Sequence, residues 1–150
     1  LKGADLESAD LYRADLFKAI LEDVDLQDAN LDQPDLRKAI LIKADLRGAN
    51  LFRARMQGAN LSEADCYRAD LEKSDLSDAN LYKADLRESN LHAVNLQGAN
   101  LMGADLEGAN LFEADLTEAN LEGLSLERTN LESAKFLKTI MPDGHSHTRQ

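Results

Sequence analysis

The side chains best suited to chemistry in this sequence include three histidines, two of them in the segment HSH near the C-terminus. His145 and His147 alternate in that segment and could bind a metal ion weakly, but no third ligand lies near them in the sequence. Protein metal sites usually need three or four converging ligands. His92 stands beside Leu91 and is expected to face outward. The three histidines are therefore predicted to be exposed and to form no metal site.

The single cysteine and the many carboxylates are the other groups that can react. Two interpretations of Cys66 are a redox or metal-binding thiol and a buried apolar side chain. It stands at a repeat position that is nearly always held by leucine, which favours burial. The 28 Asp and Glu residues offer carboxylate pairs, but acid–base catalysis needs a pair with separated pKa values in a cleft. The sequence also has no glycine-rich phosphate loop and no catalytic triad motif. It therefore predicts a protein that is not an enzyme and binds no cofactor.

Negative charge dominates the segment from Glu88 to Glu127, which contains no lysine or arginine. The whole chain has a formal net charge of −11, which argues against direct binding to nucleic acid or anionic membranes. Acidic residues around exposed apolar anchors suit docking to a basic protein, and an ordinary solvated surface is the alternative. The residues of this predicted acidic patch are Glu88, Met102, Asp105, Glu107, Phe112, Glu113, Asp115, Glu118 and Glu122.

The elements that must position these side chains follow from a period of five residues. From Leu1 to Met141 every fifth residue is apolar and nearly always leucine, and alanine usually stands two places earlier. A five-residue step turns about 140° on an α-helix and reverses the face on a strand, so neither gives an apolar face. Gaps of two and three fit short extended segments joined by corners, with leucine and alanine inside a coil. Stacked coils can then pair as parallel strands, which predicts a solenoid.

The pattern A-(D/N)-L-x-x over residues 1 to about 141 resembles the repeats of the pentapeptide-repeat family. The resemblance implies an all-β fold, a right-handed quadrilateral parallel β-helix with four pentapeptides per coil and about seven coils. Two spacings in multiples of 20 agree with four sides: Ile20, Ile40 and Ile140 fall in one column, and Tyr12, Phe52 and Phe112 in another. We expect a β-helix over residues 1–141, then a turn and a polar tail over residues 142–150.

Departures from the repeat predict local irregularities. Val94 and Leu124 replace the inward alanine and are expected to widen the coil, because a narrow bore has no room for a second large side chain. Pro34 lacks an N–H group and is expected to remove one hydrogen bond of the ladder between coils.

The two ends of the repeat differ. At the C-terminal end, Phe136, Leu137, Ile140 and Met141 can cover the last coil. The first coil shows no such cap and the chain opens on Leu1 rather than Met, so we expect missing residues or a second copy to cover it, the latter by end-to-end self-association.

The functional expectation is a structural or interaction scaffold that presents acidic faces to another protein. The resemblance supplies an alternative, since some pentapeptide-repeat proteins mimic duplex DNA and bind DNA gyrase. Those relatives typically carry phenylalanine at the central position, where this chain has leucine. The leucine-centred repeats of this chain are similar to those of pentapeptide-repeat proteins abundant in cyanobacteria. It shows no membrane-spanning run or signal segment, and the cytoplasm is favoured over the thylakoid lumen or periplasm.

Overall fold

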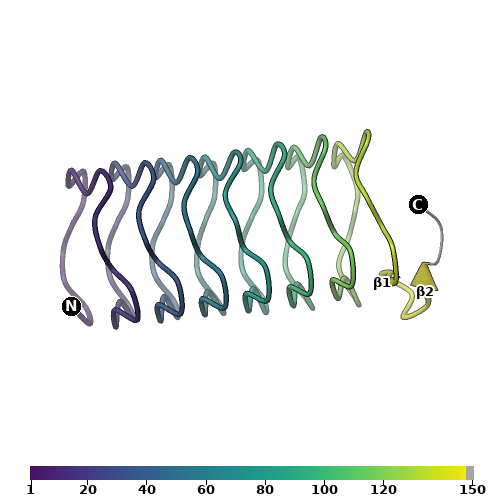
Figure 1. The fold of residues 1–150 in the computed structure, drawn as a ribbon, viewed down its shortest axis with the longest axis horizontal. Coiled ribbons are helices and arrows are strands. Elements are labelled where there is room, and N and C mark those ends of the chain that lie inside the picture. The colour runs from purple at the N-terminus through teal and green to yellow at the C-terminus, as the bar shows by residue number, and fades with distance from the viewer. Residues whose placement is uncertain (148–150) are drawn as a thin grey trace.

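The protein is an elongated rod in which the chain winds steadily from the N-terminus to the C-terminus at the opposite end (Figure 1). The computed structural model describes residues 1–147. Parallel bridges join residues 20 apart, such as Asp5 with Asp25 and Asn90 with Asn110, and they recur at every fifth residue. This register confirms that four pentapeptides complete one turn. Each bridge is a single residue wide, so the short extended segments pair through isolated bridges rather than as regular strands.

The corners are tight turns over the segment Leu-x-x-Ala. The alanine N–H donates to the leucine carbonyl three residues earlier, with an N–O distance of 3.0 Å from Ala49 to Leu46. The third residue of each turn has positive φ, as in a type II turn, and glycine suits it best. Gly98 has this conformation, with φ 65°. Lysine, arginine and glutamate also adopt it, for example Lys43 with φ 56°.

A regular hydrogen-bond ladder joins neighbouring coils. Leu46 N–H donates to the Asp65 carbonyl at 2.7 Å, and Asp65 N–H donates to the Ala44 carbonyl at 2.9 Å. The third turn residue adds another bond, from Gly48 N–H to the Tyr67 carbonyl at 3.0 Å. The side chain of the Asp or Asn also accepts the amide two residues on, as between Asp65 and Tyr67. The backbone N–H groups of a regular pentapeptide are thereby satisfied without long strands.

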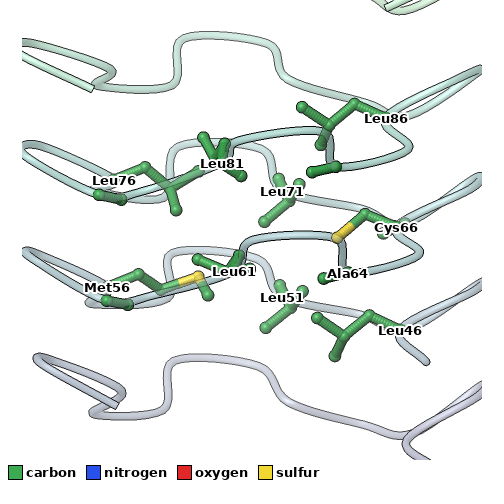
Figure 2. Packing of buried hydrophobic residues seen from close by; sticks show 14 of the residues in the cluster. Leu46, Leu51, Met56, Leu61, Ala64, Cys66, Leu71, Leu76, Leu81 and Leu86 are labelled. Atoms are coloured by element: carbon green, nitrogen blue, oxygen red, sulfur yellow. The ribbon is translucent and has the colours of Figure 1, made fainter. Parts of the chain in front are cut away.

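Leucine and alanine fill the bore, as predicted. The five-residue series from Leu21 to Leu121 is fully buried, and the inward alanines from Ala29 to Ala119 are buried with it. Figure 2 shows Cys66 between Leu46 and Leu86 in one inward column, with Met56 beneath Leu76 in another. Cys66 is 0% exposed, and burial raises the pKa of its thiol. The prediction of a buried apolar role for Cys66 is confirmed.

The predicted irregularities have mixed outcomes. Pro34 leaves the ladder intact, because its carbonyl accepts from Arg55 at 3.0 Å and Asp35 N–H donates to Ala14 at 2.9 Å. The N–H group at that position serves the turn instead, so the missing bond is a turn bond and the prediction was wrong. Val94 is also accommodated, since its carbonyl accepts from Asp115 at 2.9 Å.

Leu124 behaves differently from Val94. The parallel bridges of this column run from Asp5 to Asp105 and stop there, and within residues 1–147 none joins Asp105 to Ser125. The position next to Leu124 has therefore lost its ladder contact. The extra methylene of leucine explains the difference from valine, because close-packed interiors tolerate little added volume.

The C-terminal end of the rod carries the two regular strands, β1 (Thr139–Ile140) and β2 (Ser146–His147), which pair antiparallel. The connection between them contains a turn in which Gly144 N–H donates to the Met141 carbonyl at 2.8 Å. Phe136 and Met141 are partly buried against the core, in line with their predicted capping role. Strand β2 was not expected, because the polar segment HSH gives no apolar alternation. The division at residue 141 and the rest of the tail, including residues 148–150 outside the described range, stay predictions.

Candidate interaction surfaces

The predicted acidic patch does not lie on one side of the rod. The 20-residue register places its members beside four different bridge columns, so that they form a belt around the rod. Met102 and Glu122 occupy one column, and Asp105 and Glu107 lie beside another. The remaining two sides carry Phe112 with Glu113, and Asp115 with Glu118. A single flat partner therefore meets only part of this belt at one time.

Cations from neighbouring coils pair with most of the acidic side chains of the belt. Glu107 lies 2.9 Å from Arg128, Glu88 lies 2.7 Å from Arg68, and Glu118 lies 2.9 Å from Lys138. Asp115 and Asp105 have looser pairs, with Lys135 at 3.6 Å and Arg87 at 3.7 Å. The segment lacks basic residues in sequence, but the coil brings them from about one turn away. Its surface is therefore less uniformly negative than the sequence predicts.

The two apolar members of the predicted patch differ in exposure. Met102 is 37% exposed, whereas Phe112 is half-buried with its ring 5.6 Å from the ring of His92. His92 also lies between two carboxylates, 3.5 Å from Glu72 and 3.7 Å from Glu113. Phe112 is thus a component of a packed surface column rather than the exposed anchor that the sequence predicts.

A column of aspartates on one side of the rod is the acidic feature that sequence reasoning missed. Its members follow the bridge register and are Asp5, Asp25, Asp45, Asp65, Asp85 and Asp105. Reading the sequence in steps of 20 would have found it. The side-chain hydrogen bond from Arg47 lowers the pKa of Asp45, and Arg87 lowers that of Asp85 in the same way. Beside this column a shallow hollow of about 380 Å³ is lined by Tyr67, Arg87, Glu107 and Gly108, among others.

One group of three carboxylates within residues 1–147 has the spacing of metal ligands. Asp5, Glu7 and Asp25 have carboxylate oxygens within 4.8 Å of one another, and they are the one such group in residues 1–147. They lie at the outer surface, and the Asp5 oxygen accepts the Glu7 amide at 3.1 Å. His145 is 3.3 Å from Asp143, while the His147 ring lies 5.9 Å from Phe136. The two histidines therefore have different neighbours, and the acidic group resembles an ordinary surface cluster.

Asp35 is the carboxylate whose pKa is shifted most among residues 1–147. It receives hydrogen bonds from Arg37, with Nε–Oδ1 at 2.8 Å and Nη2–Oδ2 at 2.6 Å, and Arg55 lies 3.4 Å away. The Arg37 hydrogen bond is the main cause that lowers the pKa of Asp35 to about 2. One carboxylate thus holds two guanidinium groups on the same side of the rod.

The comparisons with known proteins identify the family. The model of pentapeptide repeats matches residues 1–33, 35–65, 69–108 and 109–142, in 8 copies. The chain therefore belongs to the pentapeptide-repeat family. Membership of this family implies a right-handed quadrilateral β-helix, and pentapeptide-repeat proteins are generally non-enzymatic scaffolds. A comparison with curated protein sequences finds no significant match.

Several solved structures resemble the chain. HetL from the cyanobacterium Nostoc sp. strain PCC 7120, a pentapeptide repeat protein involved in heterocyst differentiation regulation, is 37% identical, with 98% of this chain and 76% of HetL covered and a TM-score of 0.40. A pentapeptide repeat protein from the Arabidopsis thaliana thylakoid lumen is 34% identical over 65% of this chain and 64% of its own, with a TM-score of 0.52. The fluoroquinolone resistance protein QnrB1 is 16% identical over 89% of this chain and 84% of its own, with a TM-score of 0.55, and shows the shared fold alone.

None of the described residues belongs to a helix that could cross a lipid bilayer.

Acid should weaken the stabilisation that Asp35 provides. A carboxyl group whose folded-state pKa lies below its ordinary value of 3.8 stabilises the folded protein above that value. The contribution is lost as the pH falls from about 4 to about 2. In urea titrations we expect the free energy of unfolding to fall over this window, and to fall less steeply in Asp35→Asn. Arg37→Gln should flatten the slope too, because it removes the main hydrogen-bond donor; an unchanged slope in both variants would contradict this assignment.

Proposed function

We propose that this chain is a non-catalytic scaffold whose regular outer surface binds another protein. The observation that carries the proposal is the unbroken five-residue register from Leu1 to Met141. In a β-helix of about seven coils, this register repeats each outward column at intervals of ~4.8 Å without an inserted loop. Such a surface suits extended recognition of a macromolecule, whereas catalysis usually draws on loops and clefts.

The predicted acidic patch remains our candidate binding surface for a basic partner. Several of its carboxylates, such as Glu107 and Glu118, are held in exposed ion pairs, and such pairs contribute only about 0–1 kcal/mol each. A partner that supplies lysine or arginine can therefore replace Arg128 at Glu107 or Lys138 at Glu118 at small cost. Met102 adds an exposed apolar side chain, and Glu122 in the same column has no ion pair within residues 1–147. The aspartate column extends the acidic surface along one side.

Affinity capture with charge-reversed variants tests this function. The variant Glu107→Lys, Glu113→Lys, Glu118→Lys should lose a partner that the wild-type chain captures reproducibly. A basic partner on any of the three sides that these residues occupy then meets a positive charge in place of a negative one. The control Glu7→Lys, Glu22→Lys, Glu63→Lys has the same net charge but lies outside the belt, and it should retain the partner. Circular dichroism establishes that all proteins are folded. Retention by both variants rejects the acidic patch.

The alternative function is a DNA-mimicking binder and inhibitor of DNA gyrase. The net charge of −11 on a rod supports it, and the likeness to QnrB1 adds only the fold. The same capture experiment separates the two functions, because this alternative requires gyrase as the captured protein and inhibition of its supercoiling activity. The paired charges of the belt favour the scaffold, since duplex DNA presents unpaired phosphates along its whole length.

End-to-end self-association through the N-terminal coil is a further mode of the same scaffold. Leu1 is 65% exposed, and Leu6, Leu11 and Leu16 are only half-buried, while Leu21 is enclosed. Two such ends can bury this apolar surface against each other. Light scattering should then give a molar mass that rises with concentration toward two chains. The variant Leu6→Asp should stay at the mass of one chain, and a wild-type mass that never exceeds one chain contradicts this mode.

A further inference from the structure

One side of the N-terminal half of the rod carries an excess of positive charge, although the chain as a whole is strongly acidic. We call it the basic patch, and it consists of Phe17, Lys18, Arg37, Lys38 and Arg55. The register brings these residues together: Asp15 bridges Asp35 and Asp35 bridges Arg55. The ladder bond from Lys18 N–H to the Arg37 carbonyl measures 3.0 Å. It places Lys18 and Arg37 side by side on neighbouring coils. Residues from three successive coils therefore share this surface.

The cations of the basic patch are incompletely neutralised. Asp35 is the shared partner of Arg37 and Arg55, so one carboxylate serves two guanidinium groups. Arg37 uses its Nε and Nη2 groups on Asp35, and a guanidinium has further N–H donors. Lys18 and Lys38 have no ion pair within residues 1–147. This contrasts with the belt, where most charged side chains have a partner of opposite sign.

Two more arginines extend the patch along its edge. Arg13 and Arg53 precede Asp15 and Arg55 by two residues, in a column that continues to Ser133. Ser133 lines the same hollow as Lys135 and Leu137, which shows that these columns face one side of the rod. The positive side chains of this surface therefore outnumber its carboxylates, which are Asp15 and Asp35.

An exposed aromatic ring lies in the basic patch. Phe17 is 44% exposed, one of the few large apolar side chains at the surface. The Lys18 Nζ lies 5.0 Å from its ring centroid and the Arg37 Cζ lies 5.3 Å from it. Cations at this distance are attracted to the ring face and are held beside it. The patch thus offers one apolar contact surrounded by oriented hydrogen-bond donors.

We propose that the basic patch is the docking site for an acidic segment of a protein partner, in which Asp or Glu side chains meet the cations and an apolar side chain covers Phe17. This inference rests on the proposed scaffold function and assigns it a second surface with the opposite charge preference. Charge complementarity carries the assignment, since carboxylates match the forked donors of arginine.

A protein segment fits this surface better than a nucleic acid does. Asp15 and Asp35 lie among the cations of the basic patch, and the same side continues to Asp75 and Asp78. A long polyphosphate would extend over these carboxylates, which repel it. A short acidic peptide can place its side chains on the lysines and arginines alone.

The test measures binding of a fluorescein-labelled peptide of glutamates with one central phenylalanine, by fluorescence anisotropy at low ionic strength. The variant Lys18→Glu, Lys38→Glu should weaken binding about tenfold, because two attractions become repulsions. The control Lys43→Glu, Lys83→Glu changes the net charge equally and also acts at corner residues with φ near 55°. It too includes a lysine over an aromatic ring, Lys83 over Tyr82. The control should bind within about twofold of the wild type.

Three outcomes overturn the docking site: no binding by the wild-type chain, equal weakening in both double variants, or tighter binding of a duplex DNA than of the peptide. Failure of the site differs from failure of the scaffold function. A wild-type chain that captures its partner but ignores the acidic peptide loses the basic patch and keeps the proposed function. A chain that binds the peptide at the basic patch but captures no partner keeps the docking site and loses the proposed function.

Discussion

Packing of one leucine and one alanine into each side of a narrow bore is the constraint on which the rest of the structure depends. The two side chains stand two residues apart and point inward, and the turn that follows returns the chain to the same orientation five residues later. Because alanine is small, leucines from opposite sides can meet at the axis at the density of a protein interior. Leu124 shows the limit of this packing, since the adjacent bridge to Asp105 is missing.

The same constraint determines how the surface is organised. Because inward positions are fixed, the other three residues of each pentapeptide face outward and align with residues 20 positions away. Charges that are distant in sequence become neighbours, as Glu107 and Arg128 do at 2.9 Å. The aspartate column and the basic patch arise in this way on different sides of one acidic rod. Function in such a protein depends on which side chains the columns bring together, since the fold itself is shared by proteins with different roles.

The sequence was sufficient to predict the architecture because a five-residue apolar period fits few backbones. It also identified Cys66 as a buried side chain. It failed where the outcome depended on details of the turn: the amide replaced at Pro34 belongs to the turn rather than the ladder, a distinction that the apolar spacing does not contain. The difference between Val94 and Leu124 depends on a single methylene in a close-packed bore.

The surface was predicted less well than the core. The charges along residues 88–127 predicted a uniformly negative surface, because only neighbours in the sequence were counted and neighbours in space were not. Side-chain pairs such as Glu118 with Lys138 depend on the coil period and on the reach of long side chains. Phe112 was expected to be exposed and instead packs against His92, for the same reason. In both cases the contacts join residues on neighbouring coils, which a count of charges along the chain does not contain.

The most direct test of the central claim is the free energy of unfolding of Ala84→Leu, measured by urea denaturation beside Ala93→Leu. Ala84 is an inward alanine that is 1% exposed, whereas Ala93 is an outward corner residue. The account predicts a loss of about 1–3 kcal/mol for Ala84→Leu, because the bore has no space for a second large side chain, and little change for Ala93→Leu. Equal stability of the two variants would contradict the account.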